Sequence, residues 1–228
     1  MKKIFFIASV LTLFSFNAIY AADFKVGIGI GGDIGFISTA FNTTIPEPEK
    51  SQIEELLKDT KMNRGGFCFF LDLTYFEISM GGKYYNILIK QNGADLKETQ
   101  SYFNLGVIGK IPFDLNSRLS LFPFIGLDFQ ALTKFKDSIG SYSETVTRSE
   151  LSDYDIDREY FDRTVFNFGL GMDVYIVRGL FFRGSFNYGI NFHTRQQKDL
   201  IDVINDMGYK MFVLNHGPSV KFAMGYKF

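Results

Sequence analysis

The sequence of 228 residues has no tryptophan, five prolines, two histidines and a single cysteine. Because Cys68 has no second cysteine to pair with, an internal disulfide framework is excluded. Positive and negative charges almost cancel, with 24 Lys and Arg against 25 Asp and Glu. The chain therefore lacks the basic excess of a nucleic-acid-binding protein. Beyond residue 22, no apolar run reaches the roughly 18 residues that a membrane-spanning helix needs.

Residues 1–22 have the layout of a secretory signal peptide. Two lysines precede an apolar run, and Ala21 and Ala22 supply small residues at its end. A buried helix of the mature fold is the alternative interpretation, but the order of charge, apolar run and small residues favours the signal. The sequence thus predicts export, with 23–228 as one mature domain. Without the two lysines, 22 Lys and Arg stand against 25 acids, a net charge of −3.

Eight stretches alternate between apolar residues and small or polar ones, in a sequence with 17% aromatic residues and 22 glycines. A period of two is typical of a β-strand whose two faces meet different surroundings. In the third stretch the alternation slips near Gly81 and Gly82, which predicts a bulge. The predicted strands are 24–36, 67–75, 77–90, 101–110, 119–130, 165–176, 180–192 and 212–228.

The connections between these strands alternate in length. Those after the first, third, fifth and seventh strands have about 30, 8, 34 and 19 residues, and the others are short, as in an outer-membrane barrel. The non-apolar faces are rich in Gly, Asn and Ser, which suit a narrow lumen. The predicted fold class is all-β: an eight-stranded antiparallel up-and-down transmembrane β-barrel with long extracellular loops and short periplasmic turns. A secreted soluble β-sandwich is the alternative, although its connections seldom alternate in this way.

The last strand has the most specific pattern, because apolar residues fill every second position up to an aromatic last residue. With the signal peptide and the eight strands, it resembles the small outer-membrane β-barrel proteins of the OmpA, OmpX and OmpW-like group. The resemblance covers residues 23–228 and implies a place in the cell outer membrane, in contact with its lipid. It also implies that the barrel-assembly machinery recognises the alternating residues, which are Val220, Phe222, Met224, Tyr226 and Phe228.

Two short segments and the missing tryptophan bear on how closely the chain resembles this group. The segments FLDLTYFEISMGG and GKIPF are similar to small barrels of spirochaetes. The missing tryptophan is a departure, so the aromatic girdles would have to consist of phenylalanine and tyrosine. The tyrosines expected there are Tyr75, Tyr175, Tyr188 and Tyr226.

Several charged residues fall on the non-apolar strand faces and are predicted to point into the lumen. Charges buried in so narrow a space have to be paired or hydrated. Two interpretations stay open: a structural plug of ion pairs, favoured by the small lumen of eight strands, or the lining of a narrow pore. The predicted interior charges are Asp72, Lys110, Asp128, Asp173, Arg183 and Lys221, with Glu77 as a further candidate.

The two histidines, His193 and His216, suggest a third function, that of an outer-leaflet lipid-modifying enzyme. Such an enzyme needs a nucleophile, a base and an orienting group in contact, which sequence spacing does not provide. Counted back from Phe228, His216 faces lipid unless Gly217 and Pro218 form a bulge. The acidic segment SDYDIDRE lacks the glycine and glutamate of a calcium-binding loop. We therefore expect no catalytic residue, no cofactor and no metal site.

Function is expected in the long loops. In the loop 37–65, apolar residues at helical spacing follow Ser51, which with Glu54 matches a capping box and predicts a short helix. The pattern of residues 200–211 predicts a second helical turn. The loop 131–163 is polar and charged. The first helix could cap the barrel mouth or meet a partner. We expect a monomeric barrel with a structural or surface-interaction role, a host or environmental ligand at the loops, and no nucleic-acid partner. The alternative is an OmpW-like narrow channel for small or apolar solutes.

Overall fold

The computed structural model describes residues 25–91, 94–139, 142–154, 157, 159–192 and 194–228. The predicted signal peptide, 1–22, lies outside the described residues and stays a prediction.

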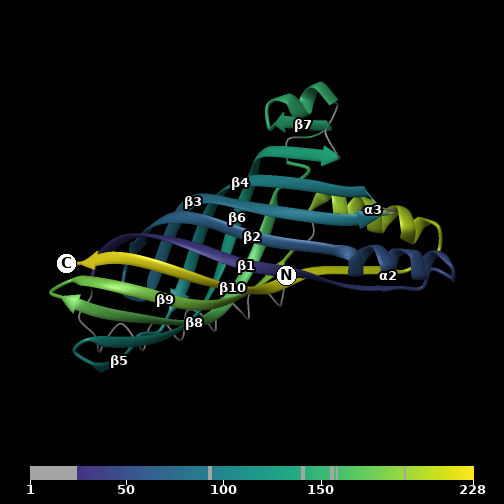
Figure 1. The fold of residues 1–228 in the computed structure, drawn as a ribbon. Helices are drawn as coiled ribbons and strands as arrows, with labels where there is room; N and C mark the ends of the chain where they lie inside the picture. The colour runs from purple at the N-terminus through teal and green to yellow at the C-terminus, as the bar shows by residue number, and fades with distance from the viewer. Residues whose placement is uncertain (1–24, 92–93, 140–141, 155–156, 158, 193) are drawn as a thin grey trace.

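Eight long antiparallel strands form a closed barrel, as the sequence predicts (Figure 1). Each pairs with its neighbours along the chain, and the first strand pairs with the last from Gly27 opposite Lys227 to Thr43 opposite Met211. The wall therefore has no free edge, and its backbone groups are paired within it. The barrel strands are β1 (Gly27–Thr43), β2 (Thr60–Asp72), β3 (Phe76–Gln91), β4 (Ala94–Lys110), β6 (Leu119–Ile139), β8 (Arg163–Val177), β9 (Leu180–Asn191) and β10 (Met211–Lys227).

The remaining elements lie in the connections. Figure 1 shows α2 and α3 at one end of the barrel, here the long-loop end, and β5 with the C-terminus at the other, the short-turn end. At the short-turn end, a two-residue turn joins β8 to β9, and its Gly179 has a φ of 81° that favours glycine. None of the described helices is both long and apolar enough to cross a membrane. These elements are α2 (Glu49–Asp59), β5 (Phe113–Asn116), β7 (Tyr142–Thr147), the 3-10 helix η1 (Glu150–Tyr154) and α3 (Arg195–Asp206).

Successive side chains point alternately outward and into the lumen. On β2, Phe69 is 58% exposed, whereas the next residue, Phe70, is 4% exposed. Water does not favour so large an apolar surface, whereas lipid does, and the closed strand ladder leaves no backbone group to be solvated. The barrel is therefore a transmembrane barrel, and its lipid-facing belt includes Ile28, Ile30, Ile34, Phe67, Phe69, Ile78, Met80, Phe103, Leu105, Ile125, Phe129, Phe168, Leu170, Phe182, Phe186, Phe222 and Met224.

The bulge predicted in β3 is wrong. The strand pairs with β2 and β4 without a register shift through Gly81 and Gly82. A Cβ atom on Gly81 would lie 2.0 Å from the carbonyl oxygen of Phe67. The glycine thus permits a close approach of two strands. It interrupts the apolar alternation but leaves the ladder intact.

Strands at the long-loop end extend further than predicted. The pairing of β3 with β4 continues to Gln91 opposite Ala94, so only residues 92–93 remain of the long third connection. Likewise, β6 continues to Ile139 and pairs with β7, so the predicted loop 131–163 is partly strand. Apolar alternation marks only strand segments with one face in lipid and the other in the lumen. Beyond the belt the outer face no longer meets lipid, and the alternation in the sequence disappears.

Both helices predicted in the loops are present, although their starts differ from the prediction. Helix α2 begins at Glu49, and the predicted capping box of Ser51 and Glu54 is wrong, because the Ser51 hydroxyl donates to Glu47 at 2.5 Å. Helix α3 begins at Arg195, before the predicted residue 200, and Thr194 and Gln197 form a complete capping box at its start.

Candidate functional site in the lumen and at the long-loop end

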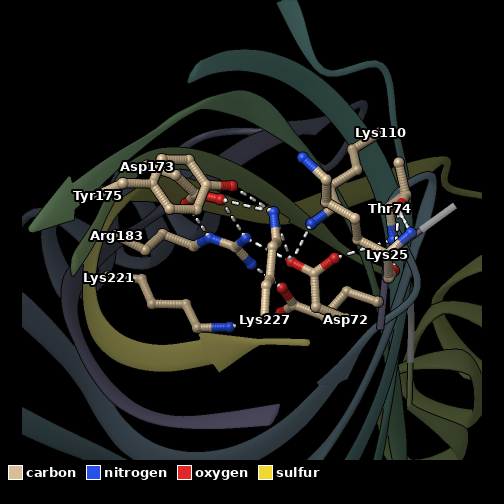
Figure 2. A network of polar contacts seen from close by, with 10 residues as sticks. Lys25, Asp72, Thr74, Lys110, Asp173, Tyr175, Arg183, Lys221 and Lys227 are labelled. Atoms are coloured by element: carbon tan, nitrogen blue, oxygen red, sulfur yellow. Dashed lines mark hydrogen bonds and ion pairs between the residues drawn. The ribbon is translucent and has the colours of Figure 1, made fainter. Parts of the chain in front are cut away.

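Charged residues from six strands meet inside the barrel near the short-turn end (Figure 2). Strand pairing sets Asp173 opposite Arg183, which makes an acid and a base neighbours, and Asp72 opposite Glu77, which makes two acids neighbours that need cations from other strands. Their side chains are at most 11% exposed. We call this set the charged cluster: Asp72, Glu77, Lys110, Asp173, Arg183, Lys221 and Lys227.

Arg183 lies at the centre of the charged cluster. Its Nε donates to Oδ1 of Asp173 at 2.6 Å, and its Nη2 donates to Asp173 and Asp72 at 2.8 and 2.5 Å. Its Nη1 donates to Glu77. The guanidinium also lies over aromatic rings, 4.8 and 5.1 Å from the centroids of Phe122 and Phe181. All three carboxylates are thus bound to one buried cation.

Three lysines complete the charged cluster. Nζ of Lys110 lies 2.5 Å from Oδ2 of Asp72, and Nζ of Lys221 lies 2.8 Å from Oε1 of Glu77. Lys227 contacts Asp173 at 3.2 Å and donates to the hydroxyl of Tyr175 at 2.8 Å (Figure 2). In the charged cluster, four cations therefore share three carboxylates, and removal of any one carboxylate would leave buried cations without their partner.

The charged cluster also holds the turn between β2 and β3. Oδ1 of Asp72 accepts the backbone N–H of Thr74 at 3.0 Å. Thr74 has a φ of 66°, an uncommon conformation for a β-branched residue, and its hydroxyl donates to the carbonyl oxygen of Lys25 at 2.9 Å. The lumen charges are thus tied to the backbone at the short-turn end.

Besides the charged cluster, a second group of side chains, mostly apolar, obstructs the lumen toward the long-loop end. The rings of Tyr85 and Tyr102 meet edge to face at 5.4 Å, and the guanidinium of Arg163 lies 4.4 and 4.5 Å from their centroids. Leu151, from η1, is only 4% exposed, so the loop after β7 inserts a side chain here. We call this cluster the apolar plug: Ile37, Tyr85, Tyr102, Leu132 and Leu151.

An ion pair fastens the loop that carries Leu151. Arg148 donates from both terminal nitrogens to Asp162, at 2.5 and 2.9 Å. Asp162 also accepts the backbone N–H of Leu132 at 2.9 Å. These bonds join β6 to the start of β8 where the two strands stop pairing, beyond Gln130 opposite Arg163. The hydrogen bonds to Asp162 also raise the pKa of Arg148.

Between the charged cluster and the apolar plug lies a small polar cavity of about 40 Å³. Asp128, one of the predicted interior charges, lines this cavity. It accepts hydrogen bonds from the side-chain amides of Asn167 and Asn104, at 3.0 and 3.4 Å. Along its axis, the described lumen thus contains the charged cluster, the polar cavity and the apolar plug, in that order.

The structure brings five of the six predicted interior charges into the charged cluster, along with the further candidate Glu77; Asp128 lies apart. Lys227, which alternation places on the same strand face as Lys221, was not among the predicted interior charges, yet it belongs to the charged cluster. The sequence reasoning also missed Arg64 and Arg163, because the predicted strands began too late to include either residue. If the alternation of inward and outward residues had been continued beyond the lipid-facing belt, it would have placed both arginines in the lumen.

The histidines show no catalytic constellation in the described chain. His216 lies in β10 without a bulge at Gly217 and Pro218, and its Nδ1 is 2.5 Å from the hydroxyl of Tyr188. His193 lies outside the described residues. Within the described ranges, no three His, Cys, Asp or Glu side chains gather as metal ligands.

Helix α3 exposes an apolar stripe at the long-loop end. Leu200, Val203 and Met207 are 53%, 51% and 64% exposed, and their spacing places them on one helical face. A second stripe with the same spacing is acidic and also exposed: Asp199, Asp202 and Asp206. Ile201 and Ile204, on another side of the helix, are less exposed.

The residues of the predicted assembly signal line the outer face of β10 near the short-turn end. Phe222, Met224, Tyr226 and Phe228 are exposed, and Val220 is partly buried. The backbone N–H of Phe228 donates to the carbonyl oxygen of Val26 at 2.8 Å, so the last residue is still joined to the wall.

No family model and no curated protein sequence matches the chain. Solved structures similar to it include neisserial surface protein A, NspA (9% identity, 88% of this chain and 97% of that chain covered, TM-score 0.45). Outer membrane protein OprG of Pseudomonas aeruginosa (12%, 90% and 96%, 0.41) and Ail, the attachment invasion locus protein of Yersinia pestis (12%, 91% and 100%, 0.35), are also similar. The spirochaetal likeness of the two short segments finds no support among these structures.

Proposed function

We propose that the chain is an integral protein of the outer membrane that acts as a closed barrel and binds a surface partner through its long loops. The observation that carries the proposal is the exposed apolar stripe of α3, displayed at the long-loop end of a barrel with an obstructed lumen. In this orientation the long-loop end is extracellular and the short-turn end periplasmic. Residues 1–22 would direct export, and a barrel without free edges would act as a monomer.

The partner that fits α3 is a protein surface with an apolar groove and a cationic rim. A helix that presents apolar residues at positions i, i+3 and i+7 suits a hydrophobic groove. The neighbouring stripe of Asp199, Asp202 and Asp206 would repel lipid phosphates and attract lysine or arginine. Charge thus favours a basic protein over the surface of the surrounding membrane.

A binding experiment with synthetic peptides tests this proposal. The refolded protein in detergent is titrated with an amphipathic peptide that has leucine on one face and lysine on both flanks, and with the same peptide carrying glutamate in place of lysine. We expect binding of the lysine peptide only, weakened by salt. Failure to bind either peptide, or equal binding of both, would overturn the proposal.

Matched variants locate the binding surface. The triple change Leu200→Ser, Val203→Ser and Met207→Ser should abolish binding of the lysine peptide. A control triple change on the exposed side of the other loop helix, Gln52→Ser, Glu55→Ser and Lys58→Ser, should leave it unchanged. Loss of binding in both variants, or in neither, would contradict a site on α3.

A narrow channel for small or apolar solutes is the second candidate. The observation that favours it is a hollow of about 560 Å³ at the short-turn end, lined by Lys25, Arg118, Tyr175 and Lys227 among others. Against it, the path continues through the charged cluster and the apolar plug. A conducting state would have to rearrange both.

We infer no catalytic role for the chain. His216 lies on the outer wall, where its ring stacks on Tyr188 and its Nδ1 lies within hydrogen-bonding distance of the tyrosine hydroxyl. An aromatic pair at the membrane interface accounts for these contacts as well as a catalytic site would. Turnover of outer-membrane lipid by the protein, lost on His193→Ala or His216→Ala, would overturn this inference.

A further inference from the structure

The polar cavity between the charged cluster and the apolar plug contains two charges that have no ionic partner. Among the described residues, no carboxylate lies within ion-pair distance of Arg64, and no cation lies within that distance of Asp128. Both side chains line the cavity. The other charges at its wall are paired, Lys83 with Asp33 and Lys221 with Glu77.

Several hydrogen-bonding atoms at the cavity wall are also unused. Nε of Arg64 and Oδ1 of Asn104 are buried without a partner in the described chain, although these residues are only 8% and 2% exposed. Oδ1 of Asn187 is buried and unpartnered as well. A buried polar atom without a hydrogen bond is unfavourable, so three at one cavity indicate a ligand that the protein atoms do not provide.

The cavity has the size and the chemistry for water. A water molecule needs roughly 10–15 Å³ of such space, so a cavity of about 40 Å³ has room for roughly three or four molecules. The unused groups include both a donor, on Arg64, and acceptors, on Asn104 and Asn187. Water satisfies donors and acceptors together, whereas an anion satisfies only donors and a cation only acceptors.

We infer that a small cluster of bound water molecules occupies this cavity and joins Arg64 to Asp128 as a water-bridged ion pair. The remaining contacts agree with this assignment. Nη2 of Arg64 uses Ser219 as acceptor at 2.8 Å, and Asp128 uses the amides of Asn167 and Asn104, so both charges keep capacity for water. The bridge would compensate two charges that strand register holds apart.

Nuclear magnetic resonance of the refolded protein in deuterated detergent detects such water directly. We expect water-to-protein Overhauser effects with the sign of long-lived bound water at the side-chain amides of Asn104 and Asn187. The amide of Asn63 is the control, since it is exposed and meets only rapidly exchanging water. Absence of long-lived water signals from both buried amides would overturn the proposal.

A double-mutant cycle tests the bridge itself. Arg64→Met and Asp128→Asn should each lower the equilibrium constant for folding. In the double variant, the loss should be at least about threefold smaller than the product of the two single losses. Additive effects would overturn the bridge. If a single variant fails to fold, the measurement on the wild-type protein still decides whether the cavity is dry.

Discussion

Nη2 of Arg183 lies 2.5 Å from Oδ2 of Asp72, although 111 residues separate them in the chain. The first comes from β9 and the second from β2, so the contact crosses the lumen instead of following the strand ladder. The same guanidinium binds Asp173, its direct cross-strand neighbour. One residue thus links opposite walls of the barrel, and its neighbours depend on it for charge compensation.

Arg183→Met should lower the free energy of unfolding by about 3–5 kcal/mol, because it leaves three buried carboxylates with fewer cations. Denaturant unfolding in detergent micelles, followed by far-ultraviolet circular dichroism, measures the change. Arg178→Met at the adjacent turn is the control, since Arg178 is exposed and the change should stay within about 0.5 kcal/mol. Equal effects of both substitutions would contradict the central role of Arg183.

The refolded protein should show no single-channel conductance steps in planar bilayers, because two separate obstructions block the lumen. Tyr102→Ala with Leu151→Ala should also stay silent, since the charged cluster remains. Insertion is checked by protease protection of the same preparation in liposomes. Ion-selective steps from inserted wild-type protein would refute the closed barrel and support the channel.

Asp162→Asn should loosen the loop that carries Leu151, because it weakens the bond to Arg148. The two side chains are 30% and 28% exposed, so the loss of stability should be at most about 1 kcal/mol. Limited proteolysis between β7 and β8 should accelerate. Lys50→Gln, which breaks the more exposed pair with Glu54 on α2, outside this loop, is the matched control. Acceleration in the control alone would show that the Arg148–Asp162 pair does not hold this loop.

Acid should loosen the start of η1 through Glu150. The backbone N–H of Thr147 donates to its carboxylate at 2.7 Å and lowers its pKa below the ordinary value of 4.5. Because the folded-state pKa is depressed, the stabilisation is complete above pH 4.5 and is lost as the pH falls through the folded-state pKa. Hydrogen exchange at the Thr147 amide should rise in this window, relative to amides of the barrel wall. In Glu150→Gln, this pH dependence should disappear, and its persistence would assign the effect to another group.

Deletion of Phe228 should impair barrel assembly, as predicted from the terminal pattern. Its backbone N–H also holds Val26, and its ring packs on Tyr226 at 5.2 Å, so the deletion weakens the seam between first and last strands. Heat-modifiable gel migration of the outer-membrane fraction measures the folded amount. Phe228→Tyr keeps an aromatic terminus and should assemble normally. Full assembly of the deletion variant would contradict an assembly role for this residue.

Alternation along the chain by itself determined the eight membrane-crossing segments, the faces of their residues outside the stretch near Gly81 and Gly82, and the pairing of the last strand with the first. These properties depend on local backbone geometry and on the need of a lipid-exposed sheet to close. The charges of 67–75, 165–176 and 180–192 could therefore be assigned to the lumen from parity alone.

Only the tertiary structure decided which inward residues meet. Alternation places Asp72 and Asp128 in the same interior. The first belongs to the charged cluster, whereas the second lines a small cavity together with Arg64, which has no ionic partner among the described residues. Such neighbours depend on strand stagger around the closed barrel, which brings residues more than a hundred positions apart to one level. The insertion of Leu151 was equally hidden, because a loop side chain has no periodic signal. Sequence periodicity thus specifies the faces of the wall, and the three-dimensional closure specifies what fills it.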